Sequence, residues 1–130
     1  MQHDPRKLLK VARWLGPVCA RMHVGHDVRL ASEPCEDGAH ATIQRDGMGF
    51  VLHIEGAFFT RAPSLQRAVL VHELAHTYFD DMDAVHEAML DARLSSVEAD
   101  TLRRLRGNAE HAAIEKITRA IAPHMPLPRF

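Results

Sequence analysis

The stretch "AVLVHELAHTYF", residues 68–79, constrains the fold of this chain more than any other. His72 and His76 are four residues apart, so on a helix they share one face and both imidazoles can bind one ion. Glu73 lies about 100° further round such a helix, where it can reach a water in an open coordination position. The spacing therefore predicts a Zn²⁺ site with His72 and His76 as ligands and Glu73 as catalytic general base.

The surroundings of the motif favour a helix over a chance arrangement in a chain with ten histidines. Pro63 opens a helical pattern that continues to about Asp80, which predicts an active-site helix over 63–80. Its other face is apolar and consists of Val71, Leu74, Ala75 and Tyr78. Such a helix packs into a core on one side and presents its histidines to a cleft on the other.

A catalytic zinc site also needs a third protein ligand. The segment "NAEHAAIEKITRAI" predicts a last helix over 109–122 and contains three candidates. Glu110 shares a face with the apolar stripe that must point toward the rest of the protein, so it is the preferred ligand. Glu115 and then His111 follow as alternatives, because they lie on a more polar face. Glu110 also has a simpler interpretation, as a carboxylate favoured near a helix N-terminus.

Asp80 lies one further turn along the stripe of His72 and His76. We expect its carboxylate to accept the free N–H of a ligand imidazole, a supporting role that fixes the tautomer. The alternative is a solvated acidic helix end, which the composition of "FDDMD" also suggests.

The remaining patterns predict the other elements of the chain. Asp4 and Pro5 begin an N-terminal helical segment over 1–23, with a break or kink at Gly16-Pro17. The stretch 40–56 predicts a β-hairpin that turns at Asp46-Gly47. Its second strand, "GFVLHIEG", is either a sheet edge that binds an extended peptide or a plain core strand.

Most of residues 24–38 are predicted to form a loop, with a short strand at 28–30. Helical patterning resumes at 85–94 and 97–105, after a polar, Asp-rich stretch. Ser95-Ser96 and then Gly107-Asn108 are predicted to interrupt these helices.

Bulk properties exclude several classes of protein. The 130 residues are most simply one domain, 1–130, and the net charge of −1 gives no reason to expect nucleic acid or an anionic membrane as partner. The N-terminus lacks the apolar stretch of a signal peptide, and no apolar run reaches membrane-spanning length. Cys19 and Cys35 carry no argument for an oxidising compartment. We therefore expect a cytoplasmic protein.

These elements predict an α+β fold, with a small antiparallel sheet packed on the active-site helix and further helices toward the C-terminus. The hairpin, the "HELAH" helix and the later helix with a glutamate resemble small gluzincin-type metallopeptidases, and are similar to the ImmA/IrrE-type group. The resemblance covers roughly residues 40–126. It implies a zincin-like fold, Zn²⁺ and cleavage of protein substrates such as transcriptional repressors.

Two details qualify the resemblance. In such enzymes the helix with the ligand glutamate often ends in a Leu-Met-Pro-like stretch, and "HMPLP" at 124–128 looks similar. Alignment on that ending favours Glu115, whereas the apolar stripe favours Glu110. The chain also differs in the long segment between His76 and the last helix.

The predicted function is therefore a zinc metallopeptidase, a hydrolase that cuts peptide bonds in a protein or peptide substrate. The alternative is a zinc-stabilised binding or regulatory module that keeps the fold without turnover. A third possibility is a metal-free helical interaction protein whose histidines are incidental.

Overall fold

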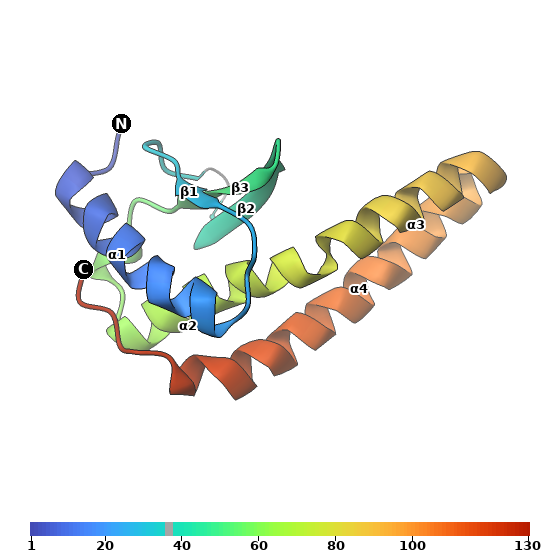
Figure 1. Cartoon of the computed structure of the whole chain (residues 1–130). Coiled ribbons are helices and arrows are strands. Elements are labelled where there is room, and N and C mark those ends of the chain that lie inside the picture. The colour runs from blue at the N-terminus through green and yellow to red at the C-terminus, as the bar shows by residue number, and fades with distance from the viewer. Residues whose placement is uncertain (36–37) are drawn as a thin grey trace.

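A computed structural model describes residues 1–35 and 38–130 (Figure 1). The described chain is α+β, as predicted. Its elements are α1 (Pro5–Arg21), β1 (Val28–Leu30), β2 (Ala41–Asp46), β3 (Gly49–Ile54), α2 (Pro63–His76), α3 (Asp80–Arg93) and α4 (Ser96–Ile121), with short 3₁₀ turns η1 (Phe58–Thr60), η2 (Thr77–Phe79) and η3 (Ala122–His124). Within this part of the chain, no helix combines the length and apolarity that a membrane crossing requires.

The sheet has the strand order β1-β3-β2. β2 and β3 form the predicted antiparallel hairpin, which turns at Gly47 with a φ of 63°. β1 pairs parallel to β3, so the sheet is mixed and not purely antiparallel as predicted. The chain before β1 passes so close that a Cβ on Gly49 would lie 2.5 Å from the Asp27 carbonyl oxygen, which explains the glycine there.

α1 runs unbroken through Pro17, so of the predicted break or kink at Gly16-Pro17 the break is wrong. The side chain of Asp4 caps the helix by accepting a hydrogen bond from the Arg6 N–H (2.9 Å). Gly16, Pro17 and Arg13 are all exposed. The Arg13 carbonyl that Pro17 leaves without a helical donor can therefore bond to water, which reduces the cost of a proline inside the helix.

The helices that follow α2 are longer than predicted. α2 ends at His76, and the Asp-rich stretch begins α3, because carboxylates are favourable in the first turn of a helix. Ser95 does interrupt the helices, as predicted, and its side chain caps α4. α4 then continues through Gly107-Asn108 as one helix of 26 residues, so the second predicted interruption is wrong.

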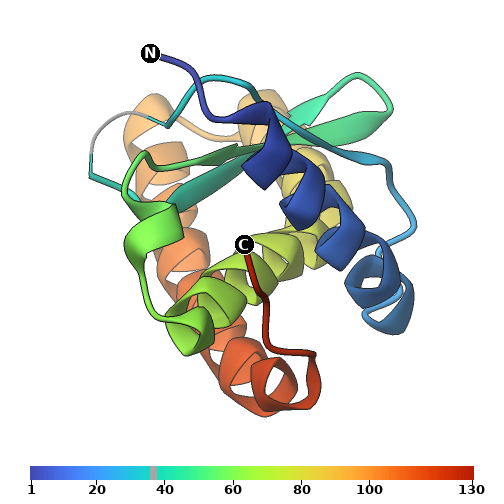
Figure 2. The same cartoon turned by 90° about the vertical axis from the view of Figure 1, so that its left-hand side faces the viewer.

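The core lies where the sheet, α1, α2 and the C-terminal segment meet. Phe130 returns to stack on Phe58, with ring centroids 5.9 Å apart, and the Trp14 indole donates to the Pro126 carbonyl (2.9 Å). The chain end consequently lies between α1 and α2 (Figure 2). Fully buried members of this core are Val11, Val18, Leu52, Phe58, Leu70, Val71 and Leu74.

α3 and the first half of α4 extend away from this core as an antiparallel pair (Figure 1). We call this pair, residues 80–93 and 96–110, the arm.

Candidate metal centre

The histidine motif occupies the last two turns of α2. Val71, Leu74 and Ala75 are fully buried, which confirms the predicted apolar back of the helix. Tyr78 departs from that prediction: it is 38% exposed, and its hydroxyl donates to the Met22 carbonyl. Because the apolar back fixes the helix against the core, the other side of α2 carries the motif's polar groups.

The imidazoles of His72 and His76 are neighbours, with ring centroids 5.1 Å apart. α4 packs against α2 and brings Glu115 Oε1 within 3.1 Å of His72 Nδ1. The ring of His111 lies 5.9 Å from that of His72. Donor atoms lie within 4.8 Å of one another in two groups, one of His72, His111 and Glu115 and one of His72, Glu73 and His76. The two groups share His72.

Glu110, the ligand preferred on sequence grounds, belongs to neither of these groups. Its carboxyl group is hydrogen-bonded to that of Asp83 in the first turn of α3, and burial and then this neighbour raise the pKa of Glu110 to about 7. The structure therefore places Glu115, and not Glu110, beside His72. Glu110 is on the inward face of α4, but it lies more than one helical turn before Glu115, where α4 faces α3.

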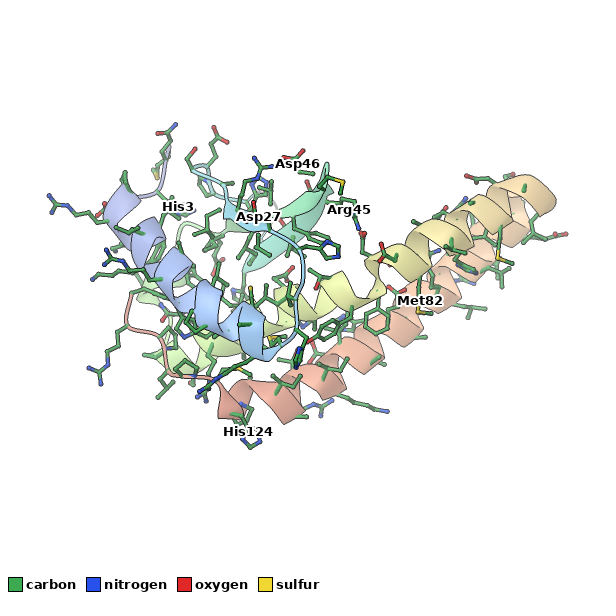
Figure 3. All side chains as sticks on the ribbon, in the orientation of Figure 1. His3, Asp27, Arg45, Asp46, Met82 and His124 are labelled. Carbon is green, nitrogen blue, oxygen red and sulfur yellow. The ribbon has the colours of Figure 1, made fainter. Side chains whose placement is uncertain are left out.

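Asp80 lies near the motif but has a different partner from the one predicted. Its carboxylate accepts a hydrogen bond from the guanidinium of Arg45 on β2, which reaches from the hairpin to the start of α3 (Figure 3). Asp83, which we did not single out from the sequence, acts electrostatically on His76 and favours its charged form. The only signal for Asp83 was its spacing of seven residues, two turns, from His76.

Burial shifts the titration of the central groups in directions that suit a metal site. Burial lowers the pKa of His72; Glu115 partly opposes this shift and His111 adds to it. Burial also lowers the pKa of His76, with a further decrease from the neighbouring imidazoles and a partial opposition from Asp83. Both rings are thus neutral near pH 7, the form that binds metals. Burial also raises the pKa of Glu73 to about 7, although a backbone hydrogen bond from Ile43 partly opposes the shift.

Pockets open on both sides of Glu73. One, of about 400 Å³, includes His72 and Glu115 in its lining, together with the apolar side chains of Leu65 and Val69. The other, of about 460 Å³, includes His76 in its lining, together with Asp80 and Asp83 of the first α3 turn. Ala41 and Glu73 line both pockets, so a molecule lying along β2 has room on either side of Glu73.

β2 is the strand at the sheet edge beside the motif, and β3 is the core strand, which is the second of the two alternatives predicted for "GFVLHIEG". β3 lies between β1 and β2, so its backbone groups already pair on both sides. The Ile43 backbone N–H donates a hydrogen bond to the Glu73 carboxylate, so this N–H points away from β3. Because backbone groups alternate along an antiparallel strand, those of Ala41 and Arg45 face the same way.

Comparisons of the chain with protein-family models, curated proteins and solved structures found no match.

Proposed function

We propose that this chain is a zinc-dependent peptidase with a zincin-like fold, in which His72, His76 and Glu115 bind the metal and Glu73 is the general base. The observation that carries the proposal is the 3.1 Å separation of Glu115 Oε1 and His72 Nδ1. Two donors about 2.0–2.2 Å from one tetrahedral zinc lie roughly 3.3 Å apart, so this pair already has the spacing of two ligands.

The donor set also fits zinc by its chemistry. Two neutral imidazoles and one carboxylate form a known catalytic zinc set, which leaves a fourth position for water or substrate. His111 is the alternative third ligand, since its donor atoms group with those of His72 and Glu115. If Glu115 is the ligand, His111 is free to donate a hydrogen bond to the oxyanion that develops on a substrate carbonyl.

In such a site, bound zinc supplies Lewis acidity, which polarises a carbonyl and lowers the pKa of water. Glu73 would transfer the proton. Its carboxylate accepts a proton from the water that attacks the carbonyl carbon, and then donates it to the amide nitrogen as the C–N bond breaks and the amine leaves. A pKa of about 7 suits both halves of this transfer near neutral pH. The outer edge of β2 would orient the substrate through backbone hydrogen bonds, with the scissile bond opposite Glu73.

Elemental analysis and hydrolysis of a mixed-sequence library of quenched fluorescent peptides test this proposal together. We expect about one zinc per chain, lost in the His72→Ala and His76→Ala variants. Glu73→Gln should keep the zinc and lower hydrolysis by at least about 100-fold, because it removes the proton acceptor without removing a ligand.

The other outcomes identify the rival functions. A Glu73→Gln protein as active as the wild type contradicts the mechanism. Zinc bound by four protein ligands, with no hydrolysis by the wild type, indicates the non-catalytic module. Absence of zinc after purification without chelators indicates a metal-free interaction protein.

A further inference from the structure

The pocket of about 400 Å³ beside Glu73 contains two polar groups that the proposed metal centre does not use. They are His40, the residue before β2, and Thr118 on α4. The same pocket has apolar lining from Leu65 and Val69 on α2. We call it the Thr118 pocket. An apolar pocket with a few polar groups is the usual construction of a site that binds one particular side chain or small molecule.

His40 is held in place by the sheet. Its carbonyl accepts a hydrogen bond from the Glu55 N–H (3.0 Å), which extends the pairing of β2 and β3 by one residue. Its Nδ1 lies 2.8 Å from Glu55 Oε1, and Arg61 Nε donates to the same oxygen (3.0 Å). The Glu55 side chain is only 13% exposed, so it is a firm anchor for the imidazole.

These contacts decide which ring nitrogen of His40 carries the proton. The hydrogen bond from His40, together with that from Arg61, holds the pKa of Glu55 below its usual value, although burial opposes the shift. An ionised carboxylate has no proton to donate, so Nδ1 must be the donor. In neutral His40, Nε2 on the opposite edge of the ring is therefore a hydrogen-bond acceptor.

Thr118 supplies a donor in the same pocket. It lies three residues after Glu115, on the same side of α4, and it is only 8% exposed. Within the described residues its Oγ1 makes no hydrogen bond. A buried hydroxyl without a partner is costly, and most such groups in proteins are bonded. The Thr118 hydroxyl can therefore donate to a group that enters the pocket.

One acceptor and one donor distinguish between classes of side chain. A primary amide satisfies both, since its NH₂ group donates to His40 Nε2 and its carbonyl accepts from the Thr118 hydroxyl. A carboxylate has no proton for His40 Nε2, and an ammonium has no acceptor for the Thr118 proton. An aliphatic side chain leaves both groups unpaired.

The positions of the two groups also favour an amide over a hydroxyl. The sheet and α4 pack against α2, which lies between them (Figures 1 and 2). His40 and Thr118 therefore belong to opposite walls of the pocket. The donor and the acceptor of an amide are on different atoms, which suits two partners that face each other better than the single oxygen of a hydroxyl does.

We infer that the Thr118 pocket binds the side chain of a glutamine that flanks the scissile bond, with its carboxamide between His40 and Thr118. His72 and Glu115 line the same pocket, so a substrate along the edge of β2 places a residue next to the scissile bond here. Leu65 and Val69 would contact the methylene groups of the glutamine. This inference rests on the proposed peptidase function and names its substrate class.

Hydrolysis of matched peptides by the zinc-loaded protein tests the inference. The cleavage products of the library locate the scissile bond, and the residue on each side is then varied among Gln, Met, Glu, Lys and Tyr. At about pH 8, where histidine is ordinarily neutral, kcat/KM for Gln on one side should exceed that for Met by at least about 10-fold, because Met leaves two polar groups unpaired. Equal or faster cleavage with Met, Glu, Lys or Tyr on both sides overturns the inference.

Two substitutions assign the preference to the pocket. Thr118→Val keeps the shape of the side chain and removes a hydroxyl that is unpaired within the described residues, so the fold should be retained. It should lower the Gln-to-Met ratio of kcat/KM to below about 3, whereas Thr101→Val on the same helix should not change the ratio. His40→Ala should lower the ratio in the same way, and His53→Ala on β3 is its control. A Thr118→Val protein with the wild-type ratio contradicts the inference.

Failure of the inference can be told apart from failure of the peptidase proposal. Cleavage without a preference for Gln overturns the inference alone. Long-range ¹H–¹⁵N NMR spectra of the full chain at about pH 8 read the His40 tautomer, and a proton on Nε2 in place of Nδ1 also overturns it. If no peptide in the library is cut, the peptidase proposal fails, and titration with N-acetylglutamine methylamide decides about the pocket. Shifts of the Thr118 methyl signal that the methionine analogue does not cause support the pocket, and equal or absent shifts overturn it.

Discussion

The part of the chain that holds the histidine motif and the arm are stabilised in different ways. Around α2, fully buried side chains such as Leu70 and Leu74 pack against the sheet and α1. In the arm, Arg103 and Arg106 form ion pairs across the helices, while Met82 and Val85 are exposed. Buried side chains are therefore concentrated around the helix that holds Glu73, whereas the arm leaves large apolar side chains exposed.

The largest effect should come from opening a cavity in the core. Leu70→Ala is expected to lower the free energy of unfolding by about 2–5 kcal/mol, because Leu70 is fully buried. Val97→Ala, at a site 75% exposed on the arm, should change it by less than about 0.5 kcal/mol. Urea unfolding measures both, and equal losses would show that the arm is packed as tightly as the core.

The next effect separates the two glutamates of α4. Loss of a group that only hydrogen-bonds a metal ligand typically weakens metal binding by roughly 10–100-fold. Glu115→Gln removes a ligand itself, so it should weaken zinc binding by more than this. Glu110→Gln should leave the affinity nearly unchanged, because Glu110 pairs with Asp83. Competition with a chelating dye gives both constants. If Glu110→Gln lowers the zinc affinity more than Glu115→Gln does, Glu110 is the ligand and the metal site lies closer to the arm.

A smaller effect concerns the burial of Glu73 in the metal-free protein. Its pKa is about 7 in the folded state and 4.5 as a free group, so between these values the folded state binds more protons. Stability contributed by the wild-type side chain therefore falls as pH rises through this window. Glu73→Gln removes the penalty and should stabilise the apoprotein by about 1–3 kcal/mol at about pH 8 and little at about pH 5. A pH-independent difference in unfolding free energy would contradict this.

The smallest effect should come from the ion pairs of the arm. Arg103→Gln removes contacts with Glu87, Asp91 and Asp100, all at the surface. Exposed pairs contribute little, so we expect only a slight decrease in the thermal unfolding midpoint, absent at about 1 M NaCl. A large decrease that persists in salt would mean that these pairs stabilise the arm far more than exposed ion pairs usually do.

Local patterns predicted those features that depend on neighbours in the chain. The hairpin followed from Asp46-Gly47, and the apolar back of α2 from its helical spacing. Glycine costs about 1 kcal/mol in a helix, which favours an interruption at Gly107, but a long helix with packing at one end can absorb that cost.

The third ligand shows why the rest of the site was harder to predict. Periodicity gives the angular position of a residue on a helix but not the height at which two helices cross. Glu110 therefore faces inward, as predicted, yet α2 meets α4 nearer to Glu115. The parallel pairing of β1, which makes β3 the central strand, likewise depends on a contact between distant segments.

The unbroken course of α4 has a mechanical consequence. Glu115 and Leu105 are on the same helix, ten residues or about 15 Å apart. A rotation or axial slip of the arm that is not absorbed at Gly107 must therefore move the Glu115 carboxylate relative to His72. α4 therefore links the position of the arm to that of the carboxylate beside the histidines.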